Sequence, residues 1–243
     1  MGGRSGRAPD SLGSTVFLDP PAPVPGLRRV LLVRHGQSEW NAAGRWQGWA
    51  DTPLTALGER QAQEAGTRIA TEGSEDRLHF VMVIASDLSR ATRTAEVLSL
   101  ALGLDPAALR LEARVREYDV GDWCGLTRPE IEEGWPGDLA RWRDGSLPQT
   151  PGGETREAFV ARLLAGIRSA ASGATEIGDD VVLLVAHGGV IGAVQRELGH
   201  DGNRDRIGNL GGRWLTIDRT GALTLGALVA LLEPDGATLS PTL

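Results

Sequence analysis

Short apolar runs alternate with longer stretches of helical periodicity along most of the chain. Runs of four to eight apolar residues between polar ones are typical of buried strands, whereas apolar residues spaced three and four apart indicate one face of a helix. Strands are predicted at 28–33, 80–86, 110–115 and 180–187. Helices are predicted at 55–71, 87–103, 155–172 and from residue 187 to about 198, with Asp87 as an N-cap and Gly103 just past a helix end.

The segments around this core differ in character. Residues 121–154, rich in Gly, Pro and Trp, are expected to form loops and short helices, and residues 212–230 alternate around a turn and predict a hairpin. Residues 1–27, with closely spaced prolines, are expected to be a flexible leader before one domain at 28–243. Alternation of strands and helices predicts an α/β fold, a three-layer α/β/α sandwich with a mostly parallel central sheet.

Composition narrows the function classes. The 243 residues are 41% hydrophobic and 23% charged, as in ordinary soluble proteins. The formal net charge of -7 argues against a nucleic-acid-binding surface, although a few arginines in one pocket could still bind a small anion. No apolar run approaches the ~18 to 20 residues that a membrane span needs, so no membrane partner is expected.

Cysteine usage suggests a compartment. Cys124 is the single cysteine, so no intrachain disulfide can form, and a reducing environment is expected. The first 26 residues lack the apolar segment of a secretory signal. We therefore predict a cytoplasmic protein, and nothing in the composition opposes a homo-oligomer.

Two histidines stand at the ends of similar apolar runs. His35 and His187 each follow four apolar residues closely and precede glycine, in the stretches "VLLVRHGQ" and "VLLVAHGG". Ligands bind beyond the carboxyl ends of strands in open α/β sheets, and glycine permits close backbone approach there. We expect both histidines at one site, whereas His79 and His200 lack this context and are expected at the surface or in structural roles.

The residue before the first of these histidines indicates the ligand. Arg34 would repel a metal ion next to His35, and no close cluster of histidine and carboxylate residues completes a metal site. Arginine instead makes paired, charge-assisted hydrogen bonds to phosphate. An imidazole held against phosphorus could attack it, and such a reaction also needs an acid to protonate the leaving oxygen.

Six ordered motifs carry a resemblance to a known family. The stretch "LVRHGQSEWN" is followed by "GRWQGWADTPLTALGERQA", "SDLSRATRTAE", "VREYDVGDWCGLT", "PGGET" and "VAHGGVI". In this order they resemble the histidine phosphatase superfamily, with its phosphoglycerate-mutase-like fold, over residues 28–200. Ordered motifs are far more specific than one short pattern.

The resemblance implies roles residue by residue. His35 would be the nucleophile, and Glu117 would protonate the leaving group and then activate water. The remaining residues would bind the phosphoryl group or the substrate: Arg34, Arg90 and His187 in the catalytic group, and Asn41, Gln47, Gly48 and Gly188 as substrate-binding residues. The scheme requires no cofactor and no metal.

Local chemistry alone leaves two of these assignments open. On spacing, Arg93 competes with Arg90, and Asp119 and Asp122 compete with Glu117; only the family pattern selects between them. Cys124 occupies a position where many relatives carry Glu or Gln, and nothing nearby suggests an activated thiolate.

Loop length points to a branch of the family. The phosphoglycerate mutases of this family carry a long insertion between the loop of the acid, here Glu117, and the helix that precedes the last strand, here predicted at 155–172. This chain has no such insertion there. We therefore predict a phosphomonoester hydrolase that forms a phosphohistidine and acts on a small phosphorylated metabolite, such as a sugar phosphate or a phosphoglycerate-like compound. The alternatives are a phosphoglycerate-type mutase and, with less support, a non-catalytic protein that binds phosphorylated ligands.

Overall fold

The computed structural model describes residues 18–75, 78–172, 180–199 and 207–232. The sheet is built from strands β1 (Arg28–Arg34), β2 (His79–Ala85), β3 (Arg110–Leu111), β4 (Asp180–Ala186), β5 (Gly211–Ile217) and β6 (Leu223–Ala230). The α-helices within these ranges are α1 (Glu39–Ala42), α2 (Ala56–Glu75), α3 (Ser89–Ala101), α4 (Arg128–Gly134), α5 (Asp138–Asp144), α6 (Arg156–Ala171) and α7 (Gly188–Leu198). Short 3-10 helices cover Pro106–Ala108, Ala113–Val115 and Gly121–Trp123.

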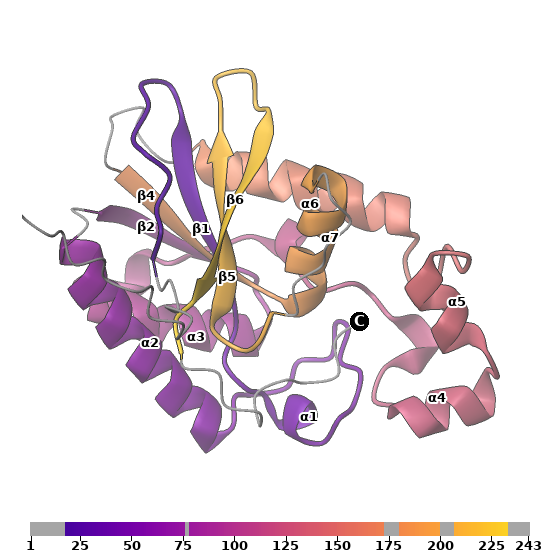
Figure 1. Ribbon diagram of the computed structural model, residues 1–243. Coiled ribbons are helices and arrows are strands. Elements are labelled where there is room, and N and C mark those ends of the chain that lie inside the picture. The colour runs from indigo at the N-terminus through magenta and orange to yellow at the C-terminus, as the bar shows by residue number, and fades with distance from the viewer. Residues whose placement is uncertain (1–17, 76–77, 173–179, 200–206, 233–243) are drawn as a thin grey trace, which may run out of the picture.

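The six strands form one sheet in the order β3-β2-β4-β1-β5-β6. The first four run parallel, β5 is antiparallel to β1, and β6 pairs with β5 as the predicted hairpin. Helices α2 and α3 cover one face of the sheet, and α6 and α7 cover the other (Figure 1). The predicted three-layer α/β/α fold with a mostly parallel sheet is therefore confirmed.

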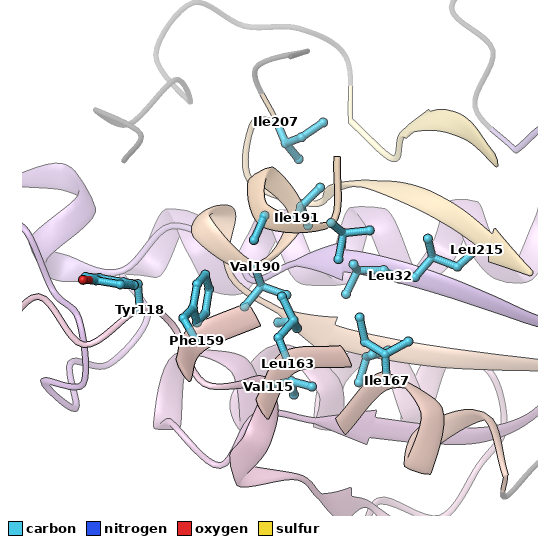
Figure 2. Close-up of a cluster of buried hydrophobic side chains, with 14 of the residues drawn as sticks. Leu32, Val115, Tyr118, Phe159, Leu163, Ile167, Val190, Ile191, Ile207 and Leu215 are labelled. Atoms are coloured by element: carbon cyan, nitrogen blue, oxygen red, sulfur yellow. The ribbon is translucent and has the colours of Figure 1, made fainter. Parts of the chain in front are cut away.

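The two faces of the sheet carry separate hydrophobic cores because successive strand residues point to opposite sides. In β1, Val30 and Leu32 face α6 and α7, in the core shown in Figure 2, while Leu31 and Val33 face α2 and α3. All four are completely buried. Burial on both faces explains why the strand is a continuous apolar run rather than an alternating one.

Two local predictions are wrong. The predicted strand at 110–115 pairs only over Arg110–Leu111, because the Glu112 side chain accepts from the Arg114 backbone and guanidinium and turns the chain into a 3-10 helix. Helix α3 is capped by Leu88, not Asp87, because both Asp87 oxygens bind the Arg116 guanidinium at 2.7 and 2.6 Å.

Other boundary predictions are confirmed. Gly103 follows the C-cap of α3 with a φ of +69°, the left-handed conformation that glycine adopts at low cost. Helix α6 begins after Thr155, whose side chain accepts from Ala158 N. Residues 121–154 contain the short helices α4 and α5 among loops, as expected. In the segment predicted as a leader, Leu18 packs against the core beneath α2 and α3, and residues 1–17 lie outside the described ranges.

The sheet brings the two predicted histidines to the same edge. Strands β1 and β4 are neighbours in register, with Arg34 opposite Ala186, and His35 N donates to Ala186 O at 3.0 Å. Helix α7 starts immediately after His187, its N-cap residue. His35 and His187 thus leave adjacent parallel strands at their carboxyl ends.

A close contact between two glycines shapes the turn after β1. A Cβ atom on Gly36 would lie 2.6 Å from Gly58 O, and one on Gly58 would lie 2.1 Å from Gln37 O. Neither distance is sterically possible, so both positions need glycine. The N-terminal turn of α2 therefore packs directly against the backbone that follows His35.

Candidate active site

The predicted site residues converge at this sheet edge. A small cavity of about 40 Å³ is lined by all of them except His187, namely Arg34, His35, Asn41, Gln47, Gly48, Arg90, Glu117 and Gly188. The His187 ring meets the His35 ring edge-on, with centroids 5.2 Å apart and planes at 64°. Residues from five separate stretches of the chain are thereby brought within one small volume.

One nitrogen of the His35 ring is hydrogen-bonded to the backbone. Its Nδ1 lies 2.6 Å from Gly36 O, and because a carbonyl oxygen only accepts, Nδ1 carries the proton. Burial, followed by the charges of Arg90 and Arg34, holds the His35 pKa well below its usual 6.5, so the ring is neutral near pH 7. The neutral ring therefore has its free lone pair on Nε2.

Several buried polar atoms around His35 lack a partner. The Nε atoms of Arg34 and Arg90 and both ring nitrogens of His187 have no hydrogen-bond partner within the part of the chain that the structure describes. His187 is completely buried, and this burial is the largest cause that holds its pKa well below 6.5. Unpaired buried polar atoms are costly, so such a cluster indicates a binding site for a polar ligand.

The two arginines are held firmly but remain charged. Arg34 donates to Ile207 O at 2.8 Å, and Arg90 donates to Ala50 O and Gly48 O at 2.7 and 2.9 Å. Burial lowers the pKa of each guanidinium to about 10, partly offset by the nearby Glu117 carboxylate. Both groups are cations at neutral pH, which favours an anionic ligand.

Glu117 lies at the cavity with both carboxylate oxygens hydrogen-bonded to backbone. Its Oε1 accepts from Tyr118 N at 2.9 Å, and its Oε2 accepts from Gly189 N, in the first turn of α7, at 3.0 Å. The residue is buried. These two bonds fix the carboxylate beside the basic residues.

The predicted substrate-binding loop is internally braced. Asn41 and Ser38 form a capping box at α1, and the Gln47 side-chain oxygen accepts from Ser38 Oγ and Thr52 Oγ1 at 2.8 and 2.6 Å. Gly48 has a φ of +50°, and its carbonyl is the acceptor for Arg90. With the Gln47 oxygen occupied, its amide N–H groups are the part left for a ligand.

Side-chain direction separates the two candidate arginines on α3. Arg90 is 1% exposed and lines the cavity. Arg93 instead donates to Glu59 at 2.7 and 3.0 Å and to Glu96 at 3.0 Å, near solvent. The geometry therefore favours Arg90, as the family pattern does.

The acidic candidates are separated in the same way. Glu117 lines the cavity, while Asp119 accepts from Gly121 N at 3.1 Å within its own turn and Asp122 is exposed. Neither aspartate lines the cavity. Of the three candidate acids, Glu117 is therefore the one that lies at the cavity.

The remaining chemically active residues lie elsewhere. The Cys124 thiol donates to Gln47 O at 3.3 Å, and although the residue is exposed, partial removal of the thiol from water raises its pKa. His79 is exposed and pairs with Asp180 at 2.9 Å, as expected of a surface residue. His200 lies outside the described residues.

Cations at the cavity are supplied by side chains. Arg45, which sequence reasoning did not select, lines it together with Arg34 and Arg90. Within the described ranges, His, Cys, Asp and Glu side chains form no group of three able to hold a metal ion. Among the residues that the structure describes, no helix is long and apolar enough to cross a membrane.

Sequence reasoning missed residues that support the site from a distance. Asn209, in the loop before β5, donates to His35 O at 2.9 Å, and Thr94 accepts from Gly36 N at 3.1 Å. Gly189 supplies the amide that binds Glu117. The Gly-Gly pair after His187 was visible in its motif, but no local pattern signals the role of Asn209.

Comparison with known proteins places this geometry in a family. The sequence pattern of the histidine phosphatase superfamily (branch 1) matches residues 30–220. A glucosyl-3-phosphoglycerate phosphatase of Mycolicibacterium vanbaalenii is 36% identical over 176 residues, which cover 71% of this chain and 74% of the relative. A protein of Salmonella paratyphi C named "Probable phosphoglycerate mutase" is 40% identical over 147 residues, covering 58% of this chain and 62% of the relative.

A solved structure resembles the fold as well. The mycobacterial glucosyl-3-phosphoglycerate phosphatase in complex with VO3 superimposes with a TM-score of 0.67 at 29% identity, covering 84% of this chain and 98% of that chain. The family match covers most of the sheet and every predicted site residue. The chain belongs to the histidine phosphatase superfamily.

Proposed function

We propose that this protein is a phosphomonoester hydrolase that transfers the phosphoryl group to His35 and then to water. The main support for this proposal is a group of buried nitrogen atoms without hydrogen-bond partners, on Arg34, Arg90 and His187. They belong to the same site as the His35 ring, which is neutral and has its lone pair on Nε2. A phosphoryl group there would satisfy these donors, and their charge would stabilise the transition state, in which negative charge spreads over three oxygens.

The reaction takes two steps. In the first, His35 Nε2 forms a bond to phosphorus, the bond to the leaving oxygen breaks, and Glu117 gives that oxygen a proton. In the second, a water oxygen attacks phosphorus, Glu117 accepts the water proton, and the N–P bond breaks to release phosphate. The side chain of Glu117 is fixed by Tyr118 N and Gly189 N beside the cavity, where it can serve both steps.

A larger cavity supports a bulky leaving group. It has a volume of about 630 Å³, lies between α5, α6 and α7, and shares Gly188 and Gly189 with the smaller cavity. This size is within the range of small-molecule sites. Its lining includes three aromatic residues, three arginines and two glutamates: Tyr118, Trp142, Phe159, Arg143, Arg156, Arg196, Glu157 and Glu197. Arginine suits the carboxylate of a ligand, and glutamate side chains accept hydrogen bonds from sugar hydroxyls.

These features, with the names of the similar proteins, favour a glycosylated phosphoglycerate as substrate. Such a compound carries a phosphate for the small cavity and a sugar and a carboxylate for the larger one. The single cysteine supports a reducing compartment, and we propose the cytoplasm as the location.

A mutase is the second candidate, because the Salmonella relative is named as one. It would transfer the phosphoryl group from His35 to a second hydroxyl of the substrate instead of to water. The absence of an insertion between the acid-bearing loop and α6 favours the hydrolase: only residues 118–155 separate Glu117 from α6.

One assay tests both candidates. Purified protein is incubated with glucosyl-3-phosphoglycerate, 3-phosphoglycerate, sugar phosphates and nucleotides, with and without magnesium. Phosphate release and isomer formation are measured separately. We expect release, highest for glucosyl-3-phosphoglycerate, without dependence on magnesium. Isomerisation without release would establish the mutase, and no reaction with any compound would contradict both candidates in favour of a binding protein.

A further inference from the structure

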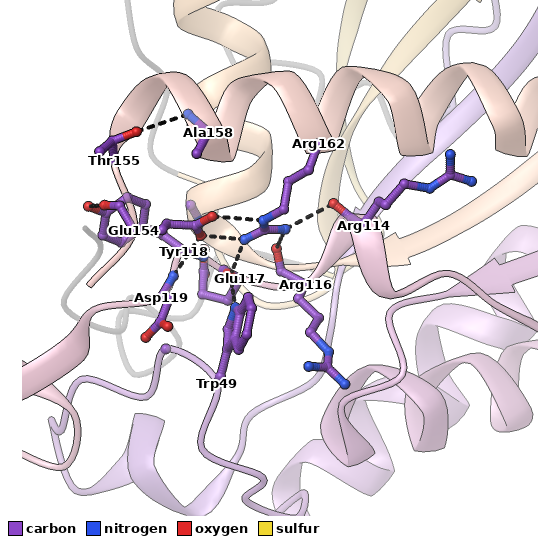
Figure 3. Close-up of polar contacts among 12 residues, drawn as sticks. Trp49, Arg114, Arg116, Glu117, Tyr118, Asp119, Glu154, Thr155, Ala158 and Arg162 are labelled. Atoms are coloured by element: carbon purple, nitrogen blue, oxygen red, sulfur yellow. Dashed lines mark hydrogen bonds and ion pairs between the residues drawn. The ribbon is translucent and has the colours of Figure 1, made fainter. Parts of the chain in front are cut away.

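One arginine side chain donates hydrogen bonds to the backbone around Glu117. Arg162, on α6, uses all five of its N–H groups (Figure 3). Its Nε and one Nη2 hydrogen bind the Glu154 carboxylate at 2.9 and 2.5 Å. Its other donors reach the carbonyl oxygens of Arg114, Arg116 and Glu117, at 2.9, 2.9 and 2.8 Å.

A second donor shares the last of these carbonyls. The Trp49 indole N–H donates to Glu117 O at 2.8 Å (Figure 3). Its ring lies near the guanidinium groups of Arg116 and Arg162, with centroid distances of 5.1 and 5.6 Å. Trp49 follows Gly48, whose carbonyl accepts from Arg90. The Glu117 carbonyl is therefore linked both to α6 and to the loop that holds Arg90.

The peptide bond after Glu117 connects these carbonyl contacts to the Glu117 carboxylate. The peptide bond between Glu117 and Tyr118 is trans, so its C=O and N–H point in opposite directions. The carbonyl end is fixed by Arg162 and Trp49, and the N–H end donates to Glu117 Oε1 at 2.9 Å. Rotation of this peptide would break the bonds at both ends. Hydrogen bonds to the carbonyl also polarise the N–H and strengthen its bond to the carboxylate.

Glu154 fixes the next peptide of the same segment. Its Oε1 accepts from Asp119 N at 2.8 Å, and its backbone N donates to Asp119 O at 3.1 Å. The Tyr118 hydroxyl donates to Glu154 O. Residues on both sides of Glu117 are therefore held by the same ion pair, which is only 18% and 14% exposed at its arginine and glutamate side chains.

We propose that Arg162, paired with Glu154, is a positioning residue that orients the Glu117 acid through the peptide bond that follows it. This proposal rests on the proposed function, because it concerns the acid of that reaction. Arg162 touches neither cavity, so its effect on catalysis passes through Glu117. A purely structural Arg162 would instead stabilise the fold without any specific link to the acid.

A double-mutant cycle separates these two roles. Arg162→Lys is made in the wild-type chain and in the Glu117→Gln chain, because lysine keeps the charge but cannot hold three carbonyls and a carboxylate. An acid contributes about 10²- to 10⁴-fold. We expect Arg162→Lys to lower kcat about 10-fold for an alkyl phosphate, which needs the acid, and at most about 3-fold for p-nitrophenyl phosphate. KM should stay within about 2-fold.

In the Glu117→Gln background the same change should have less than about a 2-fold effect, because residues that act as a unit are not additive. Equal losses for both substrates, or losses that multiply across the cycle, would overturn the proposal. Arg168→Lys, the same substitution on the same helix, is the matched control, since Arg168 binds Gly221 O and lines neither cavity. It should leave both rates unchanged.

A milder variant decides the question if Arg162→Lys does not fold. Trp49 is 42% exposed, and Trp49→Phe removes one donor from Glu117 O while Arg162 remains. It should show the same substrate dependence with a smaller loss, and an equal effect on both substrates contradicts the proposal. If Glu117→Gln alone shows no dependence on the leaving group, the acid assignment in the proposed function fails. If it does, and the cycle is additive, only the positioning role fails.

Discussion

The Nδ1 atom of His35 lies 2.6 Å from the carbonyl oxygen of Gly36, the next residue in the chain. This bond selects the tautomer and leaves the lone pair of the neutral ring on Nε2. The carbonyl of His35 is held by Asn209 and the N–H of Gly36 by Thr94. The ring is thus oriented by its own backbone, which neighbouring elements fix on both sides.

Removal of His35 should abolish the phosphoenzyme. Acid quenching of His35→Ala with labelled substrate should trap no protein-bound phosphate, because the attacking nitrogen is missing, and turnover should be lost. Circular dichroism should match the wild type, since the ring contributes little to the cores. His79→Ala, at an exposed histidine, should behave as the wild type. Protein-bound phosphate in His35→Ala would assign the nucleophile to another residue.

Glu117→Gln should slow the enzyme in proportion to the need for an acid. For an alkyl phosphate we expect kcat/KM to fall by about 10²- to 10⁴-fold, and for p-nitrophenyl phosphate by much less, since its phenolate leaves without a proton. The measurement is the slope of log kcat/KM against the leaving-group pKa. Asp122→Asn serves as the control, because Asp122 is exposed and lines neither cavity. A parallel fall for all substrates would exclude Glu117 as the acid.

Folding stability should decline as pH falls from 7 to 5. Burial, then the charges of Arg90 and Arg34, holds the His35 pKa well below 6.5, and burial does the same for His187. In the unfolded chain each imidazole titrates near ~6.5. Below that pH the unfolded state binds protons that the folded state excludes, so each histidine removes up to about 1.4 kcal/mol of unfolding free energy per pH unit.

Urea unfolding at several pH values between 5 and 7 measures this dependence. His187→Asn should show a smaller change of unfolding free energy with pH than the wild type. Asparagine does not titrate, so the unfolded variant binds one proton fewer below pH 6.5. Identical slopes in wild type and His187→Asn would show that His187 is not held neutral by folding.

Sequence reasoning succeeded where structure depends on local order. The strands β1 and β4 are continuous apolar runs because both faces of the sheet are covered, and each ends in His-Gly. The family motifs then pointed to Arg90 and Glu117, which the cavity geometry also favours. The predicted Asp87 cap failed because Arg116, 29 residues away, competes for the same carboxylate.

The remaining features depend on contacts across the fold. Asn209 meets His35 across 174 residues, and Arg162 meets Glu117 across 45. Neither residue stands in a pattern that marks its partner, because hydrogen bonds to backbone carbonyls place no demand on the identity of the accepting residue. Such supporting residues become visible only once the chain is folded.

The contact between Gly36 and Gly58 should be needed for catalysis more than for stability. In Gly58→Ala the new Cβ would lie 2.1 Å from Gln37 O, so the backbone after His35 must move. A displacement of about 1 Å at the nucleophile costs about 10²-fold. We expect kcat to fall by about that factor, with a soluble, folded protein by circular dichroism. Gly134→Ala, a helical glycine with open space around its Cβ position, is the control and should retain full activity. Wild-type kcat in Gly58→Ala would show that the turn after β1 tolerates movement without displacing His35.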